Sequence, residues 1–105
     1  MRDPVSSKND VFERLKSVGQ QLPAMGVSHL GLFGSFISGN PTPQSDVDIL
    51  VEFLPEQHTF DRFMELSFFL EDLLGRRVEL VTPEGLSPYI GPEILRQVER
   101  VQIAA

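Results

Sequence analysis

Two short motifs at a fixed spacing constrain this chain more than any other part of its sequence. Gly34-Ser35 ends an apolar run, and ten residues separate that serine from Asp46, the first residue of an Asp-Val-Asp motif. A second apolar run begins inside this motif and continues to Phe53. Because glycine ends the first run and Pro and Asn occur in the spacer, the pattern predicts two strands joined by a turn and a loop.

The two aspartates are expected to lie on one face of the second strand. Side chains alternate along a strand, so Asp46 and Asp48 point the same way. Two carboxylates at that range repel and raise each other's pKa, and a bound cation relieves the repulsion. Mg²⁺ is held in proteins by one or two carboxylates together with substrate phosphates. The motif therefore predicts a magnesium and phosphate site; the alternative is a solvated turn.

The residues around the aspartates fit the phosphate half of such a site. Gly34 allows the backbone to approach a ligand closely. Ser35 adds a hydroxyl and is predicted to open a short helical turn, whose N-terminus attracts anions. Ser45, directly before the first aspartate, is predicted to contact a nucleotide whose phosphates bind at this site.

The remaining sequence predicts a small α/β (α+β) domain. Strands are expected at 29–33, 48–53 and 78–81, and apolar spacing predicts helices at 7–22, 59–74 and from Pro92 to about Val101. Ser7 and Thr59 are expected to cap the first two of these helices. Residues 1–6 are predicted to be a flexible N-terminus, and 7–105 to be one domain.

Three later features leave alternatives open. The apolar face of 60–74 is wider than one stripe, so its excess is either buried by the first helix or exposed to a partner. Glu79, inside the third strand, faces either the metal beside the aspartates or water from a sheet edge. Arg76-Arg77 is either a solvated strand end or a contact for phosphate or for an acidic partner.

Composition narrows the class of protein. The chain has 105 residues, 41% hydrophobic content and no Cys, which indicates one domain without disulfides or thiolate metal sites. No apolar run approaches the ~20 residues that span a bilayer, and the N-terminus has no apolar signal region, so the sequence predicts a cytoplasmic protein without membrane contact. A net charge of −6 argues against direct nucleic-acid binding and suits a basic protein partner.

The Gly-Ser, ten-residue, Asp-x-Asp pattern resembles the DNA polymerase β-like nucleotidyltransferase superfamily. The short chain and the segment 45–51 resemble its minimal nucleotidyltransferase branch. The resemblance implies a mixed sheet of about three to four strands flanked by helices, with the helices on one side. It also implies that Gly34 and Ser35 bind the triphosphate of ATP. In that family a third carboxylate joins the two aspartates around one or two Mg²⁺ ions, and Glu79 matches its position, as a metal ligand or general base.

The same resemblance implies a partner. In the minimal branch the usual partner is a HEPN-domain RNase toxin, and the antitoxin transfers AMP from ATP to a tyrosine hydroxyl of that toxin. Because 105 residues leave no room for an acceptor domain, a hetero-oligomer is expected. Two departures, Ser38-Gly39 in place of Arg-Gly and Glu79 in place of Asp, favour an alternative in which a weakly active or inactive antitoxin acts by binding alone. A further alternative is transfer to a small-molecule hydroxyl.

Overall fold

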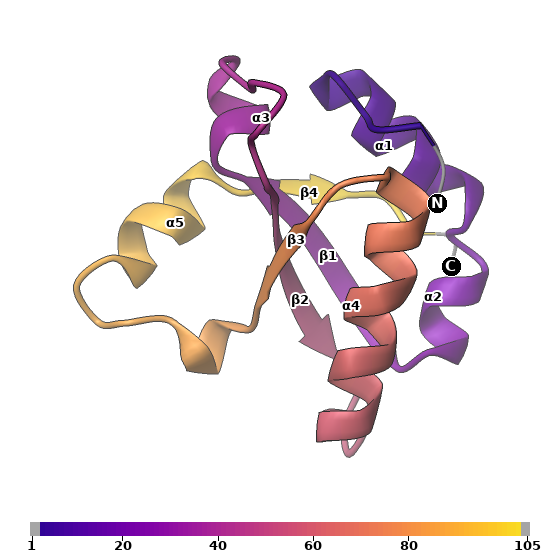
Figure 1. Cartoon of the computed structure of the whole chain (residues 1–105). Helices are drawn as coiled ribbons and strands as arrows, with labels where there is room; N and C mark the ends of the chain where they lie inside the picture. The colour runs from indigo at the N-terminus through magenta and orange to yellow at the C-terminus, as the bar shows by residue number, and fades with distance from the viewer. Residues whose placement is uncertain (1–2, 104–105) are drawn as a thin grey trace.

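The computed structural model describes residues 3–103, which form a four-stranded mixed sheet in the order β3-β2-β1-β4 (Figure 1). The first strand, β1 (Val27–Phe33), pairs antiparallel with both β2 (Val47–Phe53) and β4 (Glu99–Val101). The edge strand β3 (Val78–Val81) pairs parallel with β2. The predicted fold class is confirmed.

Helices cover both faces of this sheet. On one face, α1 (Lys8–Ser17), α2 (Gln21–Ala24) and α4 (Phe60–Leu74) bury the core side chains of the strands. The other face carries α5 (Gly91–Gln97), which follows the short 3₁₀ turn η1 (Pro83–Gly85) and lies on the opposite side of the sheet from α4 (Figure 1). The expectation of helices on one side is therefore wrong for α5. Gly31 makes this packing possible, because any side chain there would overlap Val98.

Local signals account for the two longest helices. The Ser7 hydroxyl accepts a hydrogen bond from the Asp10 N–H at 3.2 Å and caps α1. Thr59 caps α4 in the same way, through the Arg62 N–H at 3.2 Å. Gly75 ends α4 in the left-handed conformation, at a φ of 68°.

Two helix predictions are corrected by the structure. The first helix does not continue to residue 22, because α1 ends at Ser17 and a turn separates it from α2. The last helix ends at Gln97, and the residues after it form β4. The apolar side chain of Val101 fits a helical pattern, but it is buried as part of a strand that pairs with β1.

The predicted flexible segment 1–6 is also corrected within the described residues. Val5 is fully buried in the core, and its N–H donates to the carbonyl of Leu74 at 3.0 Å. The boundary at residue 7 therefore cuts through packed structure, while residues 1–2 lie outside the described range.

The wide apolar face of α4 is only partly buried. Phe60 is 77% exposed and Phe68 is 62% exposed, whereas Leu66 and Leu70 are in the core. Burial by α1 therefore does not account for the excess, and a partner surface remains the open alternative. No helix among residues 3–103 is long and apolar enough to cross a bilayer.

Candidate functional site

The sheet register brings Asp48 and Glu79 side by side. Asp48 is the second residue of β2, and its parallel partner in β3 is Glu79. Paired residues of neighbouring strands project from the same face, here the face opposite the core. Asp46 lies just before the start of β2. The structure therefore places the predicted acidic residues together where the parallel strands β2 and β3 begin.

The electrostatics of Asp48 reflect this grouping. The pKa of the Asp48 carboxyl is raised to about 6, first by burial and then by the neighbouring charges of Glu79 and Asp46. No ion pair with a basic side chain offsets the cluster among residues 3–103. The site thus holds uncompensated negative charge.

Gly34 lies directly against this carboxylate. Its φ is 77°, and a Cβ atom built on it would overlap Oδ2 of Asp48 and lie 2.8 Å from the Asp48 Cγ. The backbone at the start of α3 (Ser35–Ser38) therefore touches the acidic cluster because residue 34 has no side chain. The close approach of this backbone to a ligand, which the sequence predicted for Gly34, stays a prediction.

The serines near the site have different surroundings. Ser35 is the first residue of α3, where backbone N–H groups have no partner within the helix. The Ser45 hydroxyl instead accepts from the Thr42 N–H at 2.8 Å, so it closes its own loop. Ser38 is exposed, and its hydroxyl donates to the Ser35 carbonyl at 3.3 Å. The nucleotide contact predicted for Ser45 stays a prediction, since a hydroxyl that accepts this bond can still donate one.

The acidic residues form a suitable donor set for a divalent cation, although no three His, Asp or Glu side chains within 3–103 stand ready-made around one. Carboxylate oxygens are the ligands that Mg²⁺ prefers. Cation binding would also relieve the repulsion that raises the pKa of Asp48. Glu79 is exposed and is paired with Asp48 across the two strands. The chemistry of the site therefore fits Mg²⁺.

Arg76 has a position that the sequence did not predict. Its guanidinium contacts backbone carbonyls of the loop between α3 and β2, not an acidic side chain. Adjacent Arg77 is exposed. No local sequence signal connects an arginine to carbonyls more than thirty residues earlier, since only the fold brings them together.

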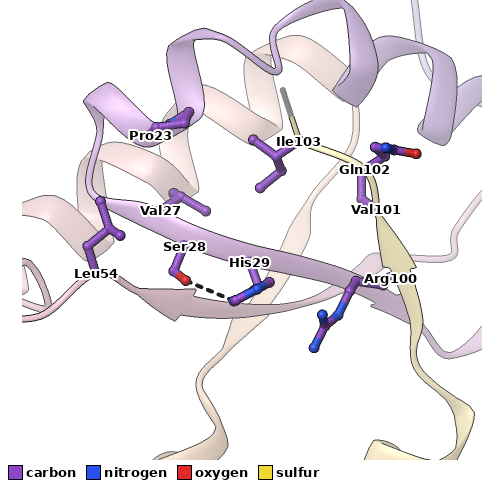
Figure 2. A pocket seen from close by; sticks show the side chains of 9 residues that line it. All are labelled: Pro23, Val27, Ser28, His29, Leu54, Arg100, Val101, Gln102 and Ile103. Carbon is purple, nitrogen blue, oxygen red and sulfur yellow. Dashed lines mark hydrogen bonds between the residues drawn. The ribbon is translucent and has the colours of Figure 1, made fainter. Parts of the chain in front are cut away.

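A well-defined cavity lies away from the acidic cluster. It has a volume of about 600 Å³ and opens where β4 ends, beside the first half of β1 (Figure 2). Ser28, His29 and Arg100 supply its main polar groups, and Val27, Leu54 and Ile103 are among its apolar ones. Because Gly34 follows the opposite end of β1, this cavity is not part of the candidate site.

We expect the metal-free protein to lose stability as the pH rises through about 6. The pKa of Asp48 is 3.8 in its ordinary state and about 6 in the fold, so between these values the folded protein binds more protons than the unfolded chain. The stability that the folded protein gains from a protonated Asp48 is fully present below about pH 4 and is lost above about pH 6. Asp48→Asn removes this dependence.

Thermal unfolding in a chelator measures this effect. At each pH, the melting temperature of wild type is subtracted from that of Asp48→Asn. This difference should be about 4–8 °C larger at about pH 8 than at about pH 4. The change corresponds to about 1 kcal/mol, after a discount for solvent screening of this half-buried group. Parallel curves for the two proteins would show that folding does not raise the pKa of Asp48.

Comparison with known proteins agrees with this geometry. Residues 12–101 match the nucleotidyltransferase domain family, and the chain belongs to that family. Within it, the chain is 45% identical over 73 residues to the protein adenylyltransferase MntA of Thermococcus cleftensis, covering 70% of this chain and 73% of that protein. The family assignment made from the two motifs is confirmed.

Solved structures show the same fold. A chain described as a minimal nucleotidyltransferase superposes with a TM-score of 0.77 at 30% identity, covering 90% of this chain and 95% of the other. The MNT antitoxin in a complex with a tri-AMPylated HEPN toxin of Shewanella oneidensis gives a TM-score of 0.63 at 19% identity, covering 90% of this chain and 73% of the other.

Proposed function

We propose that this protein is a cytoplasmic, Mg²⁺-dependent adenylyltransferase that transfers AMP from ATP to a hydroxyl of a HEPN-type toxin, with tyrosine as the acceptor, and thereby neutralises it. The observation that carries the proposal is the meeting of Asp46, Asp48 and Glu79 beside the bare backbone of Gly34. The adenylyltransferase named among its relatives and the AMPylated toxin in a similar complex support the reaction and the partner.

The residues of the site divide the work. Asp46, Asp48 and Glu79 would hold Mg²⁺, which supplies charge neutralisation for the triphosphate when it is bound. The first N–H groups of α3 and the Ser35 hydroxyl donate to the β- and γ-phosphates, and Gly34 leaves the space for them. The acceptor oxygen attacks the α-phosphorus and the bond to pyrophosphate breaks. If Asp46 and Asp48 alone hold the metal, exposed Glu79 accepts the hydroxyl proton instead.

Two alternatives make different predictions. An antitoxin that works by binding alone would neutralise the toxin without ATP or metal, and the Ser38 and Glu79 departures favour it. Transfer to a small hydroxyl compound would need no partner. The cavity of about 600 Å³ lies at the other end of β1, so it does not serve as an acceptor pocket next to the acidic cluster. Transfer to a protein therefore agrees best with the site.

Mass spectrometry of a co-expressed partner tests the proposal. A HEPN-type partner protein would be produced together with wild type and, separately, with Asp46→Asn/Asp48→Asn. We expect a mass increase of one or more AMP units only with wild type, on a peptide containing tyrosine. A stable complex without added mass, for both versions, would leave binding as the function and refute transfer.

The exposed side of α4 is the surface that we propose for the partner. Phe60, Met64 and Phe68 follow one another at four-residue intervals, and Asp61 and Glu65 are exposed beside them. Neither of these two acids forms an ion pair with another residue of the described part. An apolar row next to an acidic row fits a partner segment with apolar and basic side chains, and like charges disfavour a second copy of this chain.

We expect Phe60→Ser/Phe68→Ser to weaken the complex at least about tenfold, because large exposed aromatic residues dominate binding energies. Melting temperature and Mg²⁺·ATP binding should be unchanged, since both side chains are exposed. Co-purification and titration of the partner provide the measurement. Leu95→Ser on α5 is the comparison: if it alone breaks the complex, the docking surface lies on the other face of the sheet.

A further inference from the structure

Arg76 joins three segments that are far apart in the sequence. Its Nη1 donates to the carbonyls of Thr42, Pro43 and Ser45 at 2.9, 3.2 and 3.0 Å. Its Nε donates to the carbonyl of Val5 at 2.6 Å. The guanidinium carbon also lies 5.2 Å from the ring centroid of Phe36, a cation–π distance. These partners are backbone carbonyls and one aromatic ring, so the guanidinium of Arg76 holds backbone and not an acidic side chain.

These contacts fix the residues on both sides of Asp46. The carbonyl of Ser45 is bound by Arg76, and the N–H of Val47 donates to the carbonyl of Arg77 at 2.9 Å. The start of β3 therefore anchors the backbone immediately before and after the first aspartate. Inside the loop, the bonds between Thr42 and Ser45 close a turn but do not attach it to the sheet.

The same side chain also restrains α3. Phe36 is 1% exposed and follows Ser35 directly, so its ring anchors the Gly-Ser turn to the core. Arg76 covers that ring and grips the loop that leads from α3 to Asp46. One residue at the entrance of β3 thus connects the phosphate half of the site to its acidic half, three positions before Glu79.

We infer that Arg76 is a positioning residue, which holds Asp46 in place for the divalent cation without touching the cation or the nucleotide. This inference rests on the proposed nucleotidyl transfer. The planar guanidinium of arginine has five N–H donors in a fixed arrangement and can bind several carbonyls at once. The ammonium group of lysine cannot reproduce this arrangement. Loss of residues that orient metal ligands typically weakens metal affinity by about 10- to 100-fold.

A titration with Mg²⁺ at a fixed ATP concentration tests the inference. Calorimetry measures the binding. In Arg76→Gln we expect the half-saturating Mg²⁺ concentration to rise about tenfold while the same plateau of bound ATP is reached. Arg76→Lys should shift it in the same direction and serves as the second variant if the first does not fold. Arg77→Gln is the matched control, because its side chain has no bond among the described residues, and it should behave as wild type.

Hydrogen exchange supplies a second readout, measured where each variant is fully folded. Amides 42–46 should exchange faster in Arg76→Gln, with the β1 and β2 amides unchanged. An unchanged half-saturating concentration in both Arg76 variants, or an equal shift in Arg77→Gln, would overturn the inference while the proposed function stands. A wild type that binds no Mg²⁺·ATP would instead refute the proposed function, and the inference with it.

Discussion

Asp48→Asn is expected to abolish Mg²⁺-dependent transfer while the fold is kept. Burial and two neighbouring charges all raise the pKa of the Asp48 carboxyl, so we take Asp48 as the central ligand of the proposed site. Loss of residues that merely orient a metal ligand costs about 10- to 100-fold, and loss of a ligand itself should exceed that range. The rate of AMP incorporation into the partner should therefore fall by more than about 100-fold.

The control for Asp48→Asn lies on the same strand. Glu52 projects from the same face of β2 as Asp48, is exposed, and is at the opposite end of the strand. Glu52→Gln removes an equal charge and should leave transfer within about twofold of wild type. Normal transfer by Asp48→Asn would refute the metal assignment, and an equal loss in both variants would mean that overall charge matters, not the site.

Gly34→Ala is expected to disable the site by contact alone. Residue 34 has a φ of 77°, which L side chains rarely adopt, and the added methyl would overlap the Asp48 carboxylate. Either the carboxylate or the start of α3 must move. We expect a loss of about 1–3 kcal/mol of stability from strain and overlap together, and at least about tenfold weaker Mg²⁺·ATP binding.

Gly39→Ala separates the two causes. Gly39 ends α3 with a φ of 92°, but nothing lies within 4 Å of a Cβ built there. This variant has backbone strain without the overlap, so its nucleotide binding should stay near that of wild type. Chemical denaturation and calorimetry of both variants give the comparison. Equal effects on binding would show that strain in α3, not closeness to Asp48, explains the Gly34 result.

Elements with signals at both ends were predicted well. The helix after Thr59 and the strand 78–81 have the expected bounds, because a capping hydroxyl, a left-handed glycine and an apolar run are all local features. By contrast, β4 has only three residues, and its strand character comes from pairing with β1. The burial of Val5 likewise depends on α4 and could not be read from its neighbours in the sequence.

In the candidate site, too, some residues have local sequence signals and other contacts depend on the fold. Alternation along a strand and motif spacing predicted the aspartates and Gly34, and a single acid in the third strand indicated Glu79. The loop contacts of Ser45 and Arg76 depend on where a Pro-containing segment comes to lie against β3. The roles of Asp46, Asp48, Glu79 and Ser35 stay predictions until the variants above are measured.

The parallel pairing of β2 with β3 has a consequence for the order of folding. The antiparallel contact of β1 with β2 spans a short stretch of chain, whereas Glu79 reaches Asp48 only after α4 has crossed over the sheet. Long-range pairing of this kind forms late because loop closure must come first. We therefore expect the repulsion between Glu79 and the two aspartates to arise only at the step in which β3 docks on β2.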